Sequence, residues 1–372
     1  MSAMTNEKVT FHQAVYTLTM FGFGSSSIMG VSTGIHQDVW VSILLGALFF
    51  IPLSLVYGRI IKLFPEKNLF QVMEITLGKV AGKIFTVLMV WYSVHLAALV
   101  LHNFGDFIEV FDMPETPQLA IMILMFLITV YLARSGILVV GKWSVITLFF
   151  IFLVMVFTAI ASVTQLDPLN LFPLFEATFP EIIEDSFVVF SFPFAESVIF
   201  LCLADSFYKQ DNVYKIFFYS LAILVGIFLV IFFRNLFLLG NAMNDISYYP
   251  SYTAVRTIEI GDYFARMESS IFTNFINAGI VKITACFLAA SKGIASLFET
   301  PRAQVYILPV GLCSLALASF LYTSTMEMFA FLAYYPYYAF PFQVIIPVAA
   351  WIASEVHIRK QDMPGAQPAA AQ

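Results

Sequence analysis

The chain of 372 residues has few charged side chains, because Asp, Glu, Lys and Arg together make up only 11% of it. Soluble domains carry about 25% of these residues. Hydrophobic residues instead account for 60%, and the mean hydropathy is +0.87. Apolar runs of about 20 residues, the length needed to cross a bilayer, recur along the whole sequence. The shortage of charge therefore excludes a soluble globular protein and predicts an all-α polytopic membrane protein surrounded by lipid.

Residues and motifs that carry chemistry are also scarce. The three cysteines all lie in apolar segments without the spacing of a metal site, so we expect packing residues and no bound metal or other cofactor. The sequence contains no H-E-x-x-H, G-x-S-x-G or phosphate-binding glycine loop, and we expect no enzyme activity. The pI near 5.4 reflects acidic residues that cluster in loops on one side, and no nucleic-acid partner is expected. The first apolar segment is too long for a cleavable signal peptide.

The apolar runs define ten predicted spanning segments. Residues 1–11 are expected to form a cytoplasmic N-terminus, and residues 357–372 a disordered cytoplasmic tail. The segments divide into a first set of five over residues 12–162 and a second set of five over residues 182–356. They lie at about residues 12–35, 38–60, 83–105, 117–133, 139–162, 182–204, 214–238, 268–298, 303–322 and 336–356.

Charged residues alternate between the two sides of the predicted bundle. Basic residues concentrate between the second and third segments, as with Lys62, Lys67 and Lys79, and they also flank both ends of the chain. The loops after the third and fifth segments are acidic instead, as with Glu109 and Glu176. Because short basic loops face the cytoplasm, both termini are expected there, which requires an even number of spans.

The first segment contains a stretch, Gly22–Ser27, that is unfavourable for a helix. Glycine costs roughly 1 kcal/mol relative to alanine in a helix interior, and serine competes for backbone hydrogen bonds. One interpretation is a kink or a close-packing face of small residues. The other is a helix break beside a polar cavity, because unpaired backbone groups at membrane depth are tolerated only there or inside protein. The second interpretation makes Gly22, Gly24, Ser25 and Ser26 candidate ligand-binding residues.

The sixth segment carries a second unfavourable stretch, Phe190–Glu196. Pro193 removes a helix hydrogen bond, and Glu196 places an ionisable group at membrane depth, where a charge costs about 2.5–3.5 kcal/mol. The two stretches lie five segments apart, and since five is odd, the two halves enter the membrane in opposite directions. Paired discontinuous helices of an inverted repeat bind substrate near the midplane, with helix N-termini facing anionic groups. Ser191, Phe192 and Glu196 are therefore candidate ligand-binding residues.

The eighth segment has polar residues in the middle of the membrane. Asn274, Asn277, Thr284 and Ser291 follow helical spacing and are expected to share one face, which suits the wall of a polar cavity. Lys282 is expected to point to another face, toward small residues, and it is too central to reach the membrane surface. It should pair with an acid or an unwound carbonyl, or take the place of a coupling cation or proton.

Aromatic residues add three expectations. Tyr92 in the third segment is a candidate cavity residue, whereas His95 in the same segment is expected to be a packing residue. The Tyr334–Tyr338 stretch surrounds the predicted start of the tenth segment and is typical of an aromatic anchor at the membrane surface.

Seven short stretches, in their order and spacing, resemble the B subunits of bacterial spore germinant receptors over nearly the full length of the chain. This family belongs to the amino acid–polyamine–organocation transporter superfamily. The stretches are Gln37–Trp40, Phe64–Leu69, Arg134–Ile137, Leu171–Glu176, Phe190–Glu196, Gly261–Glu268 and Lys282–Thr284.

The resemblance implies a LeuT-like fold of ten helices with an amino-acid-type pocket between helices 1, 3, 6 and 8. By position, that pocket would include Gly24, Ser25, Tyr92, Phe192 and Thr284. The resemblance also implies two partner proteins, the receptor A subunit and the lipoprotein C subunit, in the spore inner membrane. The family usually has Gly-Thr-Gly at the first break and often Ser-Gly before the helix 6 glutamate. This chain has Gly-Ser-Ser and Pro-Phe-Ala at those places.

These observations predict a subunit that senses a nutrient, expected to be an amino acid, at the two broken helices and signals to its partners by a conformational change. The alternative is an autonomous proton- or cation-coupled amino acid transporter, because the same architecture permits transport and Lys282 could replace the coupling ion. An uptake assay on the isolated chain separates the two functions.

Overall fold

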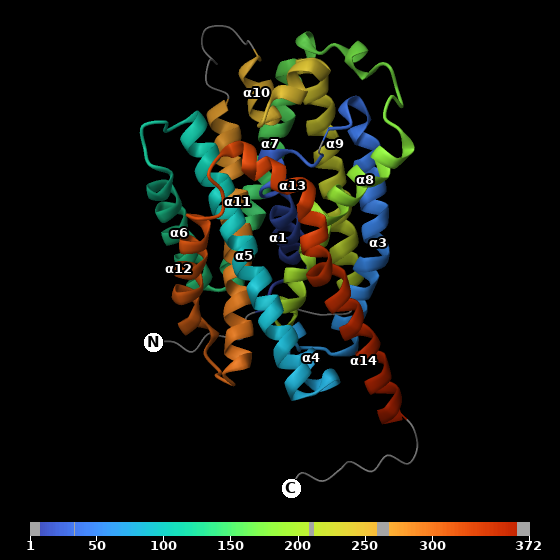
Figure 1. The fold of residues 1–372 in the computed structure, drawn as a ribbon, viewed down its shortest axis with the longest axis vertical. Coiled ribbons are helices and arrows are strands. Elements are labelled where there is room, and N and C mark those ends of the chain that lie inside the picture. Colours follow the sequence, from blue (N-terminus) through green and yellow to red (C-terminus); the bar gives the residue numbers. More distant parts are fainter. Residues whose placement is uncertain (1–7, 33, 208–211, 259–267, 363–372) are drawn as a thin grey trace.

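The computed structural model describes residues 8–32, 34–207, 212–258 and 268–362, which form a bundle of helices (Figure 1). In this part of the chain, one isolated bridge joins the extended residues Val9 and Phe207. The helices are α1 (Phe11–Phe23), α2 (Ser26–Met29), α3 (Val39–Leu63), α4 (Leu69–Leu77), α5 (Lys79–Phe111), α6 (Gln118–Ser135), α7 (Ile137–Ser162), α8 (Phe179–Val189), α9 (Val213–Ile246), α10 (Pro250–Arg256), α11 (Glu268–Leu297), α12 (Ile307–Ala318), α13 (Thr325–Phe340) and α14 (Ile346–Asp362).

Eight helical segments of the described residues are long and apolar enough to cross a membrane. They correspond to eight of the ten predicted segments. The first predicted segment is divided into α1 and the short α2, and the ninth is the shorter apolar helix Ala303–Ala318. The all-helical membrane architecture is therefore confirmed, whereas the count of ten spans stays a prediction.

The first predicted break is present at Gly24. α1 ends at Phe23, and Gly24 has a φ of −27° and a ψ of −104°, which lie outside the helical region. The neighbouring serines donate to carbonyl groups that the break leaves free. Ser26 Oγ donates to the Gly22 carbonyl at 2.5 Å, and Ser27 Oγ donates to the Gly24 carbonyl at 2.7 Å. The serine-rich sequence therefore stabilises an interrupted helix at membrane depth.

The second predicted break lies at Phe192 and Pro193. α8 ends at Val189 and is followed by a wide π-helical turn over Phe190–Phe194, in which Phe192 has an extended φ of −124° and ψ of 107°. The chain then continues as a 3-10 helix from Ala195 to Ser206. We call Phe179–Ser206 the sixth segment. Pro193 cannot donate a backbone hydrogen bond, which accounts for the position of the interruption.

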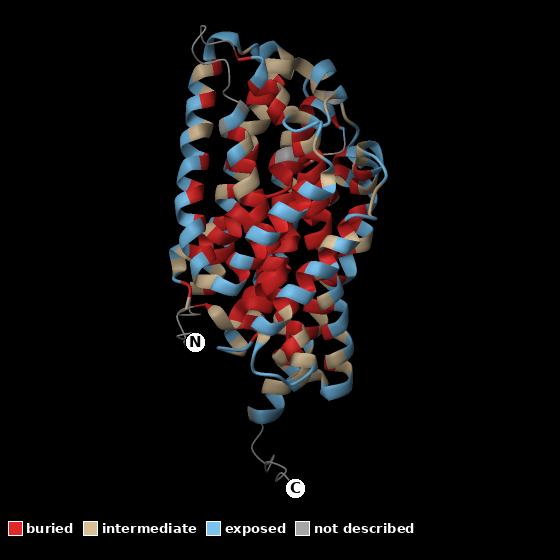
Figure 2. Cartoon of the chain, turned by 90° about the vertical axis from the view of Figure 1, so that its left-hand side faces the viewer, coloured by how far each residue is buried: buried red, intermediate tan, exposed pale blue. Residues whose placement is uncertain are grey.

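The two broken segments occupy the centre of the bundle. In the apolar part of the sixth segment 94% of residues are buried, against 28% in the segment 137–165. α1 packs against α7, α9 and α11, and residues 195–206 pack against α1 and α11. Figure 2 shows this buried centre behind helices with exposed outer faces. Those faces carry large apolar side chains such as Tyr131, Phe149 and Ile160, which suit contact with membrane lipid.

The last segment differs from its prediction. It begins at Thr325 rather than near residue 336, and it continues through Pro341–Ile345 into α14. The Tyr334–Tyr338 stretch therefore lies inside a helix. The prediction of an aromatic anchor at the surface is wrong for Tyr335, which is only 3% exposed. Proline usually marks a helix boundary, but α13 accommodates Pro336 in its interior.

The predicted ends of the chain also change. α14 runs to Asp362, so the tail boundary expected at residue 357 falls inside a helix. α1 begins at Phe11, close to the predicted start of the first segment. Residues 1–7, 261–267 and 363–372 lie outside the described residues, and with them most of the two predicted cytoplasmic ends and of the Gly261–Glu268 stretch.

Candidate functional site

Two residues of opposite charge meet at the centre of the bundle. Lys282 Nζ on α11 lies 2.5 Å from Glu196 Oε2, just after the second break, and neither side chain is more than 1% exposed. Charges that have lost their hydration must be closely paired. The sequence predicted that Lys282 needs a partner, and its ammonium group reaches that partner on the sixth segment. Of the partners considered for Lys282, the structure contains the acid.

A chain of hydrogen bonds continues from Glu196 away from the lysine. Tyr335 Oη donates to Glu196 Oε1 at 2.6 Å, so both carboxylate oxygens are engaged. Tyr335 Oη lies 3.0 Å from Tyr92 Oη, which in turn accepts from Gln343 Nε2 at 2.9 Å. Since Tyr335 uses its only proton on Glu196, Tyr92 donates to Tyr335. The donors therefore all point toward the carboxylate, which matches a negative charge on Glu196.

Gln343 anchors the far end of this chain. Its Nε2 also donates to the Ser191 carbonyl at 3.0 Å, and its Oε1 accepts from Ser191 Oγ at 2.8 Å. The Gln343 carbonyl accepts from Tyr57 Oη at 2.6 Å. Ser191 lies in the π-helical turn of the second break, next to the non-helical Phe192, so the amide supplies hydrogen bonds that the broken helix lacks. The last segment thus stabilises the break in the sixth segment.

Lys282 also passes directly beside the first break. A β-carbon added to Gly24 would lie 2.8 Å from Lys282 Cδ, closer than real β-carbons approach other atoms. The ammonium group lies 5.4 Å from the ring centre of Phe21 and 5.1 Å from that of Phe192, within the range of cation–π attraction. One lysine therefore contacts α1, the second break and the acid that follows it.

A small cavity of about 30 Å³ borders the ion pair. Ser25 from the first break and Asn103 from α5 contribute polar groups to it, together with Glu196 and Lys282. Ser25 Oγ is buried and has no hydrogen-bond partner among the described residues. Among the described residues, the Asn103 amide donates to the sulfur of Met29, a weak acceptor, at 3.1 Å. The remaining wall is mostly apolar. A ligand would therefore meet a few polar groups, one of them positively charged and one negatively charged.

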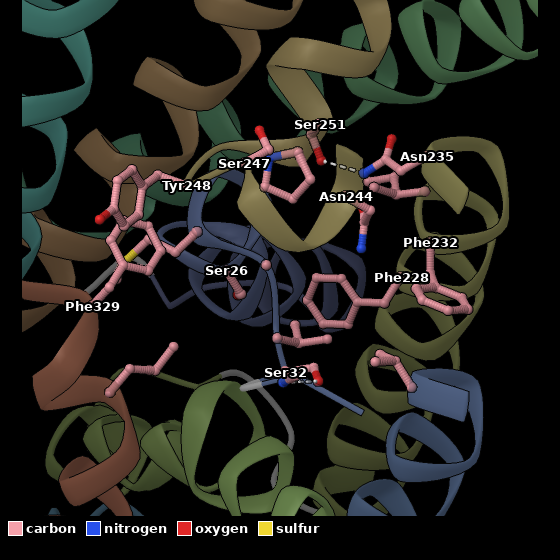
Figure 3. A pocket seen from close by; sticks show the side chains of 18 of the residues that line it. Ser26, Ser32, Phe228, Phe232, Asn235, Asn244, Ser247, Tyr248, Ser251 and Phe329 are labelled. Carbon is pink, nitrogen blue, oxygen red and sulfur yellow. Dashed lines mark hydrogen bonds between the residues drawn. The ribbon is translucent and has the colours of Figure 1, made fainter. Parts of the chain in front are cut away.

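A larger cavity of about 510 Å³ adjoins the small one, since Met29 and Leu332 line both. Figure 3 shows the polar side chains that face it, from α2, α9 and α10 and the connections between them. No Asp, Glu, Lys or Arg lines this cavity within the described ranges. It lies at the end of the bundle near α10, opposite the end where the described chain finishes (Figure 1). The large cavity therefore lies between that end of the bundle and the small cavity beside the ion pair.

The opposite end of the centre is closed by polar contacts. Lys292 Nζ of α11 lies 2.5 Å from Asp205 Oδ1 and donates to Ser206 Oγ at 2.8 Å. Asn68 Nδ2 donates to Asp205 Oδ2 at 3.3 Å, and the Val9 amide donates to the Ser206 carbonyl at 2.9 Å. These contacts join the N-terminal segment, α4, α11 and the end of the sixth segment.

A third cluster joins elements beside the large cavity. Asp106 at the end of α5 accepts from Tyr249 Oη at 2.5 Å and from Thr325 Oγ1 at 2.8 Å. Burial, and then the charge of Asp106, raise the pKa of Tyr249, which lies in the connection before α10. Tyr249 therefore keeps its proton and remains a donor over the whole neutral range. The start of the last segment is thereby held to α5.

The predicted site residues fall into three groups. Ser25, Phe192, Glu196 and Lys282 line the small cavity, and Ser26 lines the large one. Tyr92 and Ser191 support the ion pair through hydrogen bonds and do not line either cavity. The other four, Gly22, Gly24, Asn277 and Thr284, line neither cavity among the described residues.

Each residue of the last group has another contact. Gly22 faces Leu224, and Gly24 gives room to Lys282. Thr284 Oγ1 donates to the Ile280 carbonyl of its own helix at 2.6 Å, and the Asn277 amide donates back to Thr273 at 2.8 Å. The expected polar face of α11 is therefore divided between different environments, and a ligand role for these residues stays a prediction.

Sequence reasoning missed Tyr335, Gln343 and Asn103. Tyr335 was assigned to the membrane surface because proline and several tyrosines surround it. Gln343 was the better signal, since an amide inside an apolar segment must find partners at membrane depth. His95 was predicted to pack, and it stacks on Trp91 with ring centres 5.6 Å apart. The described residues contain no group of three His, Cys, Asp or Glu that could hold a metal ion.

Comparison with known proteins identifies similar sequences over nearly the full length. The profile of the family described as "Spore germination protein" matches residues 8–347. Spore germination protein KB of Bacillus subtilis (strain 168) is 23% identical over 356 residues, which cover 94% of this chain and 95% of that protein. Putative spore germination protein YfkT of the same strain is 24% identical over 344 residues, which cover 92% of this chain and 93% of that protein.

Solved structures of transporters have a similar fold. Mhp1, a nucleobase-cation-symport-1 family transporter with bromovinylhydantoin bound, matches with a TM-score of 0.72 at 12% identity, over 96% of this chain and 80% of that one. MhsT in complex with L-phenylalanine matches with a TM-score of 0.62 at 11% identity, over 93% of this chain and 97% of that one. These transporters have the LeuT fold, and the two breaks occupy the first and sixth helical segments as this fold requires.

Proposed function

The chain belongs to the spore germination protein family, and we propose that it is the nutrient-sensing subunit of a spore germinant receptor. The ligand is a small nutrient of the amino acid class, bound next to the Lys282–Glu196 ion pair. One observation carries this proposal: a fully buried ion pair contacts both helix breaks and borders a small cavity beside a larger one. The family and the fold are those of membrane permeases and not of enzymes.

An α-amino acid carries the same two charges as this ion pair. Its carboxylate fits Lys282 and the hydroxyl of Ser25, and its ammonium group fits Glu196. The small cavity of about 30 Å³ holds one or two water-sized groups, so a ligand must separate the two side chains or extend into the large cavity. Among the proteins of similar fold, one structure contains L-phenylalanine, which supports an amino acid as the class of ligand but not a particular amino acid.

Separation of the ion pair would change the conformation. Lys282 holds α11 against α1, and Glu196 holds the sixth segment against Tyr335 of α13. A ligand shifts the balance between two conformations only by its difference in affinity for them. Breaking and replacing a buried ion pair supplies such a difference, because the pair is present in one conformation and replaced by the ligand in the other.

Partner subunits would respond to this change of conformation. In the proposed receptor these are the A subunit and the lipoprotein C subunit, in the spore inner membrane, with both termini of this chain in the cytoplasm. The basic residues between α3 and α5 and at the chain ends support that orientation. Exposed apolar faces, as on α6 and α7, offer surface to lipid and to a second membrane protein.

An autonomous transporter is the second candidate function, and the LeuT fold of the transporter neighbours favours it. In that case Lys282 takes the place of a coupling cation or carries a proton beside the first break. Proteoliposomes that contain only this chain separate the two functions. Uptake of labelled amino acid that depends on an ion gradient would contradict a function restricted to sensing.

Binding and germination are the two measurements that test the sensing function. Thermal unfolding of the purified chain in a series of amino acids should identify stabilising ligands, and Glu196→Gln or Ser25→Ala should weaken that stabilisation. Spores that carry these variants should germinate slowly with the same nutrients, as measured by dipicolinic acid release. Lys83→Gln, whose ion pair with Glu299 lies at an exposed end, is the matched control. A normal response of Glu196→Gln spores at normal protein level would contradict the proposed site.

A further inference from the structure

A second buried cation lies away from the central ion pair. Arg234 on α9 is 7% exposed, and among the described residues its guanidinium group donates to neutral oxygens. Nε and Nη2 donate to Asn235 Oδ1 at 3.2 and 2.8 Å, and Nη1 donates to Thr158 Oγ1 at 3.2 Å. Arg234 forms no salt bridge with an acidic side chain of the described residues, although a charge at membrane depth ordinarily pairs with one.

A separate small cavity of about 30 Å³ borders Arg234. Its two other polar side chains are Ser251 of α10 and Asn274 of α11, and apolar residues form the rest of the wall. Ser251 Oγ accepts from Asn235 Nδ2 at 3.1 Å, so its own proton is free to be donated to the cavity. Asn274 is 8% exposed, and its amide forms no hydrogen bond with the residues that the structure describes.

The charge of the side chains that line this cavity, together with its size, indicates which ligand it could bind. Three side chains that can donate surround it, one of them is positive, and no carboxylate lines it among the described residues. One water needs about 10–15 Å³ of such volume, so the cavity holds a monatomic ion and excludes an amino acid. Ser251 and Ile231 line both this cavity and the large one, which gives an entry route.

We propose that Arg234, Ser251 and Asn274 form a binding site for a small inorganic anion of halide size, with chloride as its ordinary ligand. The anion would offset the buried charge of Arg234 and join α9, α10 and α11 through shared hydrogen bonds. The site is distinct from the Lys282–Glu196 site and does not depend on the function proposed for it.

Thermal unfolding of the purified full-length chain tests this site without any nutrient. The measurement compares sodium chloride and sodium bromide with sodium gluconate at constant ionic strength and pH. An ion that binds only the folded protein raises the melting temperature by an amount that grows with the logarithm of its concentration above its Kd. Chloride and bromide should both do so, whereas gluconate is too large to enter. Equal melting temperatures in chloride and gluconate at all concentrations would overturn the proposal.

Variants locate the effect. Arg234→Gln should abolish the chloride response, and Asn274→Ala and Ser251→Ala should each raise the chloride Kd, fitted from the rise in melting temperature, by about fivefold to tenfold through the loss of one hydrogen bond. Arg256→Gln is the matched control, because Arg256 lies at the same end of the bundle against the ring of Tyr252. If Arg234→Gln fails to accumulate, the two smaller substitutions decide between the outcomes. An unchanged chloride Kd in both of them contradicts the site. Crystals grown in bromide should show an anomalous peak beside the Arg234 guanidinium group, and bromide bound only elsewhere would also contradict it.

Discussion

Lys282 and Gly24 are in such close contact that the lysine side chain occupies the space where any other residue at position 24 would place its β-carbon. The distance from that position to Lys282 Cδ would be 2.8 Å. The glycine at the first break therefore has two functions: it permits the non-helical backbone and it makes room for the lysine that reaches Glu196.

Gly24→Ala should therefore destabilise the protein. Overpacking in a dense core costs about 1–3 kcal/mol, and here the displaced side chain also carries one half of a buried ion pair. The measurement is thermal unfolding of the purified protein, together with ligand-induced stabilisation. Gly226→Ala in α9 is the matched control, because its β-carbon would meet no atom within 4 Å. We expect Gly226→Ala to be neutral or slightly stabilising; an equal loss in both variants would contradict the specific role of Gly24.

The ion pair should show strong coupling in a double-mutant cycle. Glu196→Gln and Lys282→Met should each cost about 3–5 kcal/mol of unfolding free energy, because each leaves one buried charge without its partner. The double variant should lose less than the sum of the two. The exposed pair of Lys83 and Glu299 provides the comparison, since such pairs contribute about 0–1 kcal/mol. Additive losses at Lys282 and Glu196 would show that they do not interact as the structure indicates.

Two tyrosines of α13 allow a controlled test of the hydrogen-bond chain. Tyr335→Phe removes the donor to Glu196 Oε1 and should cost about 1–3 kcal/mol, because a buried carboxylate oxygen loses its partner. Tyr338→Phe removes a hydroxyl whose neighbour is the side chain of Trp91 and not a carboxylate. It should therefore have little effect. Unfolding free energies of the two variants give the comparison, and a larger loss for Tyr338→Phe would reverse the assignment.

The closed end of the bundle should open when its charged contact is weakened. Asp205→Asn removes the charge that Lys292 contacts, so the end of the sixth segment should separate from α11 more often. Cys202 is buried three residues earlier in the sequence and serves as a native probe. In a background with Cys286→Ser and Cys313→Ser, a maleimide reagent should modify Cys202 faster in Asp205→Asn than in the parent. Equal rates would mean that other contacts keep this end closed. Glu66→Gln, which removes a contact with Lys8, is the control because that ion pair is largely exposed.

Much of the arrangement was predictable because breaks in a membrane helix require specific residue types. Glycine and serine at the first break, and proline with a glutamate at the second, conflict with a regular apolar helix, so the sequence indicates where the helix is interrupted. Lys282 could be recognised as a residue that needs a partner. Its partner could not be identified, because the choice of Glu196 depends on how α11 rotates against the sixth segment.

The remaining errors have local causes. Tyr335 lies just outside the predicted segment, which starts at Pro336 because proline usually marks a boundary; α13 instead contains this proline. Gln343 lies inside the predicted segment, where its amide is the signal of a buried polar contact. The helical periodicity of Asn274, Asn277 and Thr284 was correct as a pattern, but neighbouring helices cover different parts of that face. Arg234 lies near the end of the predicted segment 214–238, and α9 extends well beyond it and buries it.

Tyr335 and Gln343 also determine when the polar centre can be completed during synthesis. Both broken helices, Glu196 and Lys282 precede them in the sequence, so the ribosome delivers the last donors after most of the bundle has entered the membrane. Until then Glu196 lacks one donor and Ser191 lacks its amide partner. A nascent chain stopped before residue 335 would therefore keep unsatisfied polar groups at membrane depth, which makes this final insertion a natural checkpoint for membrane quality control.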